Sequence, residues 1–241
     1  MMNSIYRWIS SDPDTNIAFH LAEKFGLTQA VSRILVSRGV STDEQAEIFL
    51  NPNRDSMHSP WLMQDMDKGA DRVAAALENH ERILVLGDYD VDGITGTAVL
   101  CAFLESQGGH VRYHIPERDT EGYGLSAETV KKAKKSGYDL IITVDSGVSN
   151  SKEAKLVSDA GMDLVITDHH EPHAELPEAV AVIDPKREDS KYPFRELAGV
   201  GVAFKLIEAV GEKRGIDREE LLEKYGEFVA LGTVGDLMPL V

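Results

Sequence analysis

Short, continuously apolar runs recur along the chain from Glu81 onward, and a segment with helical periodicity follows most of them. We expect these runs to be strands at residues 82–87, 110–115, 139–144, 163–167 and 179–183. The runs do not alternate between apolar and polar residues, which is typical of parallel strands that helices cover on both faces. The sequence therefore predicts the α/β class, with an open, doubly wound, mostly parallel sheet.

Helical segments also precede the first predicted strand. They are expected at residues 20–25, 29–38, 42–50 and 66–80, and Ser41-Thr42-Asp43-Glu44 supplies an N-cap signal. Further helices are expected at residues 94–107, 126–136, 151–160, 199–214 and 218–229. We therefore predict a small N-terminal helical region, residues 1–65, followed by a larger α/β domain, residues 66–241.

Composition limits the setting of the protein. Hydrophobic residues make up 42% of the chain, which is enough for a sizeable core. The single cysteine, Cys101, lies in an apolar run, and no apolar run is long enough to span a bilayer. These features predict a cytoplasmic protein without a membrane partner. The net charge of −16 alone does not exclude nucleic acid, because bound divalent ions would offset several acidic groups.

Acidic residues follow three of the predicted strands. Asp88, Asp90 and Asp92 follow the first, Asp145 follows the third, and the run Asp168-His169-His170-Glu171 follows the fourth. In open parallel sheets the carboxyl ends of the strands form one ligand-binding edge, so these side chains should converge. Clustered carboxylates require a cation, and carboxylates combined with imidazole suit Mn²⁺ or Mg²⁺.

Simpler interpretations of the same residues carry less weight. A lone Asp after a strand is usually a helix N-cap, and a His pair is more often structural than metal-binding. The Asp-x-Asp-x-Asp-Gly run could be half of an EF-hand, but Val99 stands where the bidentate Glu is needed. No G-x-G-x-x-G or Walker A pattern occurs in the chain. Several acidic clusters at one sheet edge favour a metal site.

The ordered set of motifs resembles the DHH phosphoesterase superfamily, and within it the RecJ branch of single-strand-specific 5′-to-3′ DNA exonucleases. The resemblance rests on Leu86 to Gly93, Val144-Asp145-Ser146-Gly147, Asp168-His169-His170 and Gly232-Thr233-Val234-Gly235-Asp236. Residues 38–52, 65–68, 121–125 and 198–204 also look like RecJ segments. The likeness covers nearly the whole chain, in order.

The resemblance implies a role for each motif residue. Asp90 and Asp145 would hold one metal ion, and the other would be held by Asp92, Asp145, His169 and Asp236. Asp88 and Asp168 would orient ligands or water, His170 would face the scissile phosphate, and Arg118 would contact a substrate phosphate. Leu86 stands where some DHH enzymes have a histidine, so we expect the ion at Asp90 to bind more weakly.

The predicted function is 5′-to-3′ hydrolysis of single-stranded DNA by a two-metal mechanism, with a role in DNA repair and recombination. Two alternatives remain open here. One is a DHH phosphodiesterase acting on short oligonucleotides, cyclic dinucleotides or pyrophosphate, and the other is an inactive RecJ-like scaffold subunit. RecJ proteins continue into a second, substrate-gripping domain, so we expect this chain to be a fragment or to be completed by a partner chain.

Overall fold

The structure is a computed structural model that describes residues 11–52, 57–117, 122 and 124–240. The chain divides into two compact units. One consists of Met1–Met57 with Leu240–Val241, and the other of His58–Pro239.

Within its described residues, the first unit contains three short α-helices, α1 (Thr15–Phe25), α2 (Gln29–Ser37) and α3 (Asp43–Leu50). Leu21, Leu35, Val40 and Ala46 form its small core. The predicted N-cap of α3 is confirmed, because Thr42 accepts a hydrogen bond from the Gln45 backbone N–H in a capping box. Helix α1 begins five residues earlier than expected, since Asp14 caps it there.

The second unit is built on a sheet of five strands, all of which pair in parallel. The strands are β1 (Arg82–Leu86), β2 (His110–His114), β3 (Leu140–Val144), β4 (Asp163–Thr167) and β5 (Ala181–Ile183). They lie in the order β2-β1-β3-β4-β5. The predicted α/β class and parallel sheet are confirmed.

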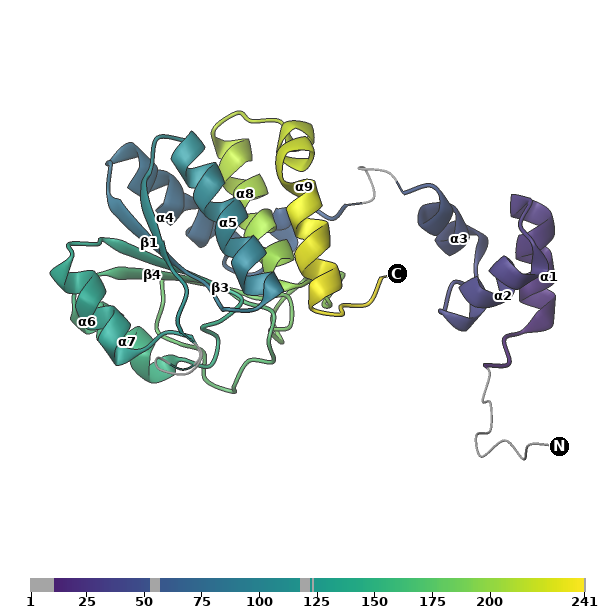
Figure 1. Ribbon diagram of the computed structural model, residues 1–241, viewed down its shortest axis with the longest axis horizontal. Helices are drawn as coiled ribbons and strands as arrows, with labels where there is room; N and C mark the ends of the chain where they lie inside the picture. The colour runs from purple at the N-terminus through teal and green to yellow at the C-terminus, as the bar shows by residue number, and fades with distance from the viewer. Residues whose placement is uncertain (1–10, 53–56, 118–121, 123, 241) are drawn as a thin grey trace. The chain divides into compact units, whose positions relative to one another are not determined.

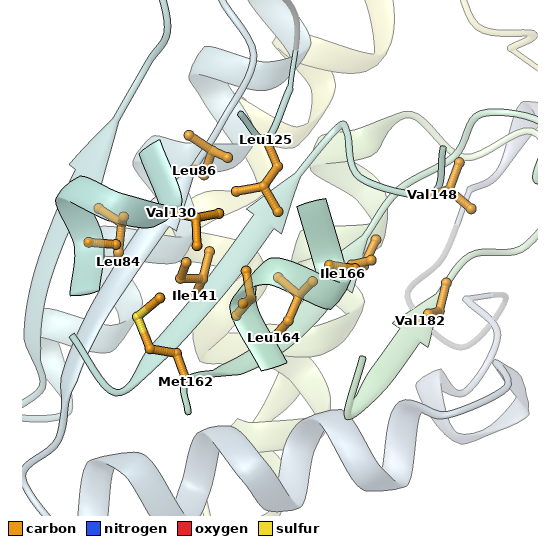
Figure 2. Packing of buried hydrophobic residues seen from close by; sticks show 13 residues of the cluster. Leu84, Leu86, Leu125, Val130, Ile141, Val148, Met162, Leu164, Ile166 and Val182 are labelled. Atoms are coloured by element: carbon orange, nitrogen blue, oxygen red, sulfur yellow. The ribbon is translucent and has the colours of Figure 1, made fainter. Parts of the chain in front are cut away.

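Helices cover both faces of this sheet (Figure 1). On one face lie α6 (Ala127–Lys135) and α7 (Ser151–Asp159), and the other carries α4 (Met66–Glu78), α5 (Val91–Ser106) and α8 (Gly199–Lys213). Helix α9 (Arg218–Gly235) packs against α5 and α8, and the short 3-10 helix η2 (Pro60–Leu62) packs against α4 and α8. Figure 2 shows the core under α6 and α7, where Leu84, Ile141 and Leu164 lie together. The doubly wound architecture is therefore as predicted.

Two helices near the carboxyl edge of the sheet are longer than the sequence predicted. Helix α5 starts at Val91 instead of Ile94, because Asp90 caps it by accepting the Gly93 backbone N–H. Helix α9 continues beyond Val229 to Gly235. Its last glycine allows a close helix contact, because a Cβ there would lie 2.7 Å from Val91 Cγ1. The sequence-based prediction ended α9 too early because glycine usually disfavours a helix.

Within the described part of the chain, no helix has the length and apolarity needed to cross a bilayer. Cys101 is buried in α5 and forms no disulfide, and burial raises the pKa of its thiol to about 12. A buried thiol that stays protonated is unreactive, so Cys101 is an inert core residue.

Candidate metal centre

The candidate site lies at the carboxyl edge of the sheet, between β1 and β3. These strands are neighbours, although the chain leaves β1 through α5 on one face and leaves β3 through α7 on the other. In open α/β sheets, ligands bind beyond the carboxyl ends of the strands at such a change of winding direction. The residues after β1 and those after β3 lie at this point of the sheet.

Asp92 is a firmly held acidic residue of the segment after β1. It lies in the first turn of α5, and only 1% of its surface is exposed. The backbone N–H groups of Gly199 and Val200, at the start of α8, donate to its two carboxylate oxygens at 2.6 and 2.7 Å. Burial raises the pKa of Asp92 more than these two hydrogen bonds lower it. The carboxylate is therefore fixed in place, but its charge is poorly compensated.

Asp145 follows β3 with a φ angle of +58°, a left-handed conformation that non-glycine residues rarely adopt. Its Oδ1 lies 3.0 Å from Nε2 of His169, which follows β4. Burial raises the pKa of Asp145 to about 7. For His169, burial acts to lower the pKa, but the hydrogen bond and charge of Asp145 outweigh it, and the pKa is raised. The two side chains stabilise each other's charge.

Asp236 brings a further carboxylate to the same imidazole. It is the C-cap residue of α9, and its Oδ2 lies 3.6 Å from His169 Nε2. The same nitrogen lies 3.8 Å from Oδ2 of Asp92. Asp92, His169 and Asp236 thus offer ligand atoms within 4.8 Å of one another. These residues come from α5, the end of β4 and the end of α9.

A second group of carboxylates, Asp88, Asp90 and Asp145, also has ligand atoms within 4.8 Å of one another. Asp88 is buried, whereas Asp90 is exposed and caps α5. Asp90 therefore is a helix N-cap, because its Oδ1 accepts a hydrogen bond from the Gly93 backbone N–H. The side chain of Leu86 has no donor atom and is fully buried in the core, so it adds no ligand to this group.

Asp168 and His170 form a pair beside these groups. Asp168 is buried and accepts hydrogen bonds from the backbone N–H groups of Val148, His169 and His170. It also lies 2.7 Å from Nδ1 of His170, and this hydrogen bond raises the pKa of His170 to about 9. Although burial acts to raise the pKa of Asp168, the hydrogen bond from His170 holds it below the usual range. His170 is therefore a half-exposed imidazolium at neutral pH.

The donors present fit a divalent cation. The buried carboxylates of Asp92 and Asp145 have raised pKa values, and a nearby cation relieves this cost of burying charge. Carboxylate oxygens together with one imidazole nitrogen are ligands that suit Mn²⁺ and Mg²⁺. No thiol is available here, because the only cysteine lies buried in α5.

A family profile and known proteins match this chain over much of its length. The sequence profile described as "DHH family, N-terminal domain" matches residues 82–233, which is more than half of the chain. The chain belongs to the DHH family. The predicted resemblance is thereby confirmed.

Its DHH relatives include single-stranded-DNA-specific exonucleases named RecJ. The RecJ of Bacillus subtilis (strain 168) is 40% identical over 240 residues, which cover 100% of this chain and 30% of that protein. The RecJ of Escherichia coli (strain K12) is 36% identical over 89% of this chain and 38% of that protein. The chain therefore spans about a third of the length of these relatives.

Solved structures of RecJ share the fold. A crystal structure of exonuclease RecJ bound to manganese is 35% identical, with a TM-score of 0.67 over 74% of this chain and 44% of that chain. RecJ from Thermus thermophilus in complex with Mn²⁺ is 27% identical, with a TM-score of 0.75 over 94% of this chain and 31% of that chain. Both relatives were solved with manganese.

Several features of the DHH site were not predicted from the sequence. Asp184 follows β5 at the same sheet edge, is fully buried, and accepts the Lys186 backbone N–H. Its position after a predicted strand was the available signal. Nothing in the sequence predicted the hydrogen bonds from Gly199 and Val200 to Asp92, apart from the RecJ-like segment in which the two residues lie. Arg118, predicted to contact a substrate phosphate, lies outside the described residues.

Proposed function

We propose that this chain is the metal-binding part of an exonuclease that hydrolyses single-stranded DNA from a 5′ end. The observation that carries the proposal is the meeting of three carboxylates, from Asp92, Asp145 and Asp236, around Nε2 of His169. The names of the RecJ relatives supply the substrate class. The alternatives of short oligonucleotides, cyclic dinucleotides and an inactive scaffold have no such support.

Two groups of residues would each hold a Mn²⁺ or Mg²⁺ ion. Asp92, Asp145, His169 and Asp236 would hold one ion, and Asp90 would share Asp145 with it to hold the other. Two such ions supply charge stabilisation for both the attacking and the leaving oxygen of an in-line displacement at phosphorus. The ion at Asp90 would be weaker, because Leu86 provides no ligand and Asp90 also caps α5.

The remaining motif residues would position groups around the reacting phosphate. Asp168 fixes His170 through the 2.7 Å hydrogen bond and keeps it protonated at neutral pH. A cationic imidazole at this point can donate to a non-bridging phosphate oxygen, on which negative charge builds up. Asp88 is buried beside Asp90 and would orient ligands or water.

The proposal also covers the organisation and setting of the protein. Residues 1–65 would form an accessory helical region and residues 66–241 the catalytic domain. The RecJ relatives are about three times longer than the matched segment, so we propose that a C-terminal domain or a partner chain completes the grip on DNA. Arg118 would contribute a phosphate contact, and the buried free thiol of Cys101 fits a reducing cytoplasm.

The proposal is tested with the chain as it stands, incubated with Mn²⁺ and end-labelled substrates. Single-stranded DNA, duplex DNA, RNA and a dinucleotide are compared, each labelled at its 5′ or 3′ end. The variant Asp145→Ala removes the shared carboxylate. Asp159→Ala is a matched control, because Asp159 is an exposed carboxylate at the end of α7 that pairs only with Lys155 among the described residues.

We expect mononucleotide release from the 5′ end of single-stranded DNA. Asp145→Ala should reduce this rate by roughly 100-fold or more, whereas Asp159→Ala should leave it unchanged. Cleavage of the dinucleotide alone, or degradation from the 3′ end, would contradict the proposed substrate. Equal rates for the two variants would contradict the proposed site.

A further inference from the structure

A hollow lies at the edge of the sheet opposite the metal centre, near the amino ends of β1 and β2. The hollow has a volume of about 430 Å³, which is in the range of small-molecule sites. It is lined by His80, Arg82, His110, Val111, Arg112 and Tyr138. None of these residues belongs to the candidate metal centre. Arg82 begins β1 and Asp88 follows its end, so the two sites are separated by roughly 20 Å at about 3.3 Å per residue.

The hollow exists because α6 covers β1 but leaves β2 open. Leu84 of β1 and Arg112 of β2 are paired in register, so their side chains share one face of the sheet. Leu84 is buried under α6, close to Val130 and Ile141 (Figure 2), whereas Arg112 is exposed. His110 shares that face of β2 with Arg112 and is also exposed. The edge strand β2 therefore exposes the side chains of His110 and Arg112 to solvent, next to the core that α6 covers.

Two guanidinium groups enter this hollow, and neither has a carboxylate partner in the part of the chain that the structure describes. Among the described residues, neither Arg82 nor Arg112 has an acidic oxygen within the 4.0 Å of an ion pair. Arg82 donates to the Ser136 carbonyl, and Arg112 donates to the Val111 carbonyl at 2.9 Å. The chain has 41 acidic and 25 basic residues, so two unneutralised arginines in one hollow are a local exception.

The nearby acidic groups are already engaged. The Asp139 carboxylate accepts the backbone N–H of Arg82 at 2.9 Å, and the Glu81 carboxylate is bound by Arg72 at 2.5 Å. Each guanidinium donates to a backbone carbonyl through Nη1, and its other N–H donors have no protein partner among the described residues. A guanidinium matches phosphate oxygens with two parallel donors.

Flat rings stand next to these donors. The guanidinium of Arg82 lies 5.1 Å from the ring centre of Tyr138, and the rings of His80 and His110 are 6.2 Å apart in an edge-to-face arrangement. Exposed aromatic rings next to basic groups are the combination on which proteins stack nucleic-acid bases. The hollow therefore combines donors for a phosphate with surfaces for a base.

We propose that this hollow binds a nucleotide, with its phosphate on Arg82 and Arg112 and its base against the rings of Tyr138, His80 and His110. The nucleotide can be free or can be one unit of a single strand, since both present the same phosphate and base. The proposal does not rest on the nuclease activity. It concerns separate residues at the other edge of the sheet, so each proposal can fail without the other.

The test is a titration of nucleotide into the 241-residue chain in EDTA, with binding monitored by ¹H–¹⁵N NMR. Thymidine 5′-monophosphate is the probe, and thymidine, inorganic phosphate and a short oligothymidylate are the comparison ligands. EDTA removes divalent ions, so a metal-bound phosphate at the other edge does not contribute. The variants are Arg112→Gln and the double variant Arg82→Gln/Arg112→Gln. Arg33→Gln, an exposed arginine of α2, is the matched control.

We expect saturable shifts in the amides around residues 80–82, 110–112 and 138, with thymidine and inorganic phosphate each binding more weakly than the nucleotide. Arg112→Gln should weaken binding roughly tenfold, the double variant should abolish it, and Arg33→Gln should not change it. If the oligothymidylate binds more tightly per strand and displaces the monophosphate, the natural ligand of the hollow is a single strand. If it does not compete, the source is the free nucleotide.

Three results would overturn the proposal. They are the absence of saturable shifts at these residues, equal affinity for inorganic phosphate and nucleotide, and unchanged binding in the double variant. Because Arg112 is exposed on an edge strand, its variant should fold, and the melting temperature of each variant verifies this.

Discussion

Oδ1 of Asp145 lies 3.0 Å from Nε2 of His169, and the two residues follow adjacent strands of the sheet. Burial raises the pKa of the Asp145 carboxylate to about 7, and the imidazole of His169 is its charge partner. The contact therefore indicates a site whose ligands are held together before any cation binds. The buried carboxylate of Asp145 is therefore expected to favour metal binding but to lower the stability of the metal-free chain.

Replacing Asp145 with Asn should separate these two properties. In EDTA at pH 8 the variant should melt at a higher temperature than the parent chain, because it lacks the buried carboxylate but keeps an oxygen that can accept from His169. In Mn²⁺ the variant should gain little stability, whereas the parent should gain much. Melting curves with and without Mn²⁺ measure both effects. A variant with a lower melting temperature in EDTA would contradict this account.

Protonation of His170 should limit nuclease activity at alkaline pH. The hydrogen bond with Asp168 raises the pKa of His170 to about 9, so the imidazolium persists below that pH and is lost above it. The pH–rate profile on single-stranded DNA should therefore fall through about pH 9. In Asp168→Asn the fall should move to lower pH, and in His170→Ala this limb should be absent. An unchanged limb in both variants would exclude His170 as its origin.

Asp184 should make the protein less stable as the pH rises. Burial raises its pKa to about 7, above the value of about 3.9 in an unfolded chain, so folding takes up a proton between these two pH values. The contribution of Asp184 to the free energy of unfolding falls from pH 4 to pH 7 and stays low above pH 7. The loss is on the order of a few kcal/mol.

Asp184→Asn removes this titration and keeps the oxygen that accepts from Lys186. Its stability relative to the parent chain should therefore increase from pH 4 to pH 8, as measured by urea unfolding in EDTA. A constant difference between the two proteins across this range would show that Asp184 does not titrate there.

Gly199 should be essential because α8 starts against Asp145. A Cβ on Gly199 would lie 2.5 Å from the Cβ of Asp145, which is too close for any side chain. Gly199→Ala should therefore displace Asp145 or the N–H that holds Asp92, with a loss of activity on the order of 100-fold.

The control for this prediction is Gly226→Ala. Gly226 also lies in a helix, α9, but a Cβ there meets no atom within 4 Å. This variant should keep full activity and should be slightly more stable, by roughly 0.5–1 kcal/mol. Rates and urea midpoints of the two variants provide the comparison, and equal activities would contradict the role assigned to Gly199.

The sequence predicted the sheet and the acidic residues at its edge because both depend on local patterns. Apolar runs such as residues 140–144 are buried on both faces, and an Asp after such a run lies at the carboxyl edge. Contacts between distant segments were not predictable in this way. The hydrogen bonds from the start of α8 to Asp92 join residues 107 and 108 positions apart.

The same limit applies to helix ends and to the hollow at the amino ends of β1 and β2. Helix α9 continues through Gly232 because α5 packs closely against it, and no local pattern records that contact. Arg82 and Arg112 are thirty positions apart in the sequence and come together only through the pairing of β1 with β2. Their place in one hollow follows from tertiary structure alone.

The central claim is that the motif acids build two unequal divalent-metal sites at one edge of the sheet. The most direct measurement is anomalous X-ray scattering at the manganese edge, from crystals of this chain soaked at low and then high Mn²⁺. At low Mn²⁺ we predict a single peak among Asp92, Asp145, His169 and Asp236, and at high Mn²⁺ a second, weaker peak beside Asp90 and Asp145. Absence of manganese from this edge, or two peaks of equal occupancy at low Mn²⁺, would contradict the account.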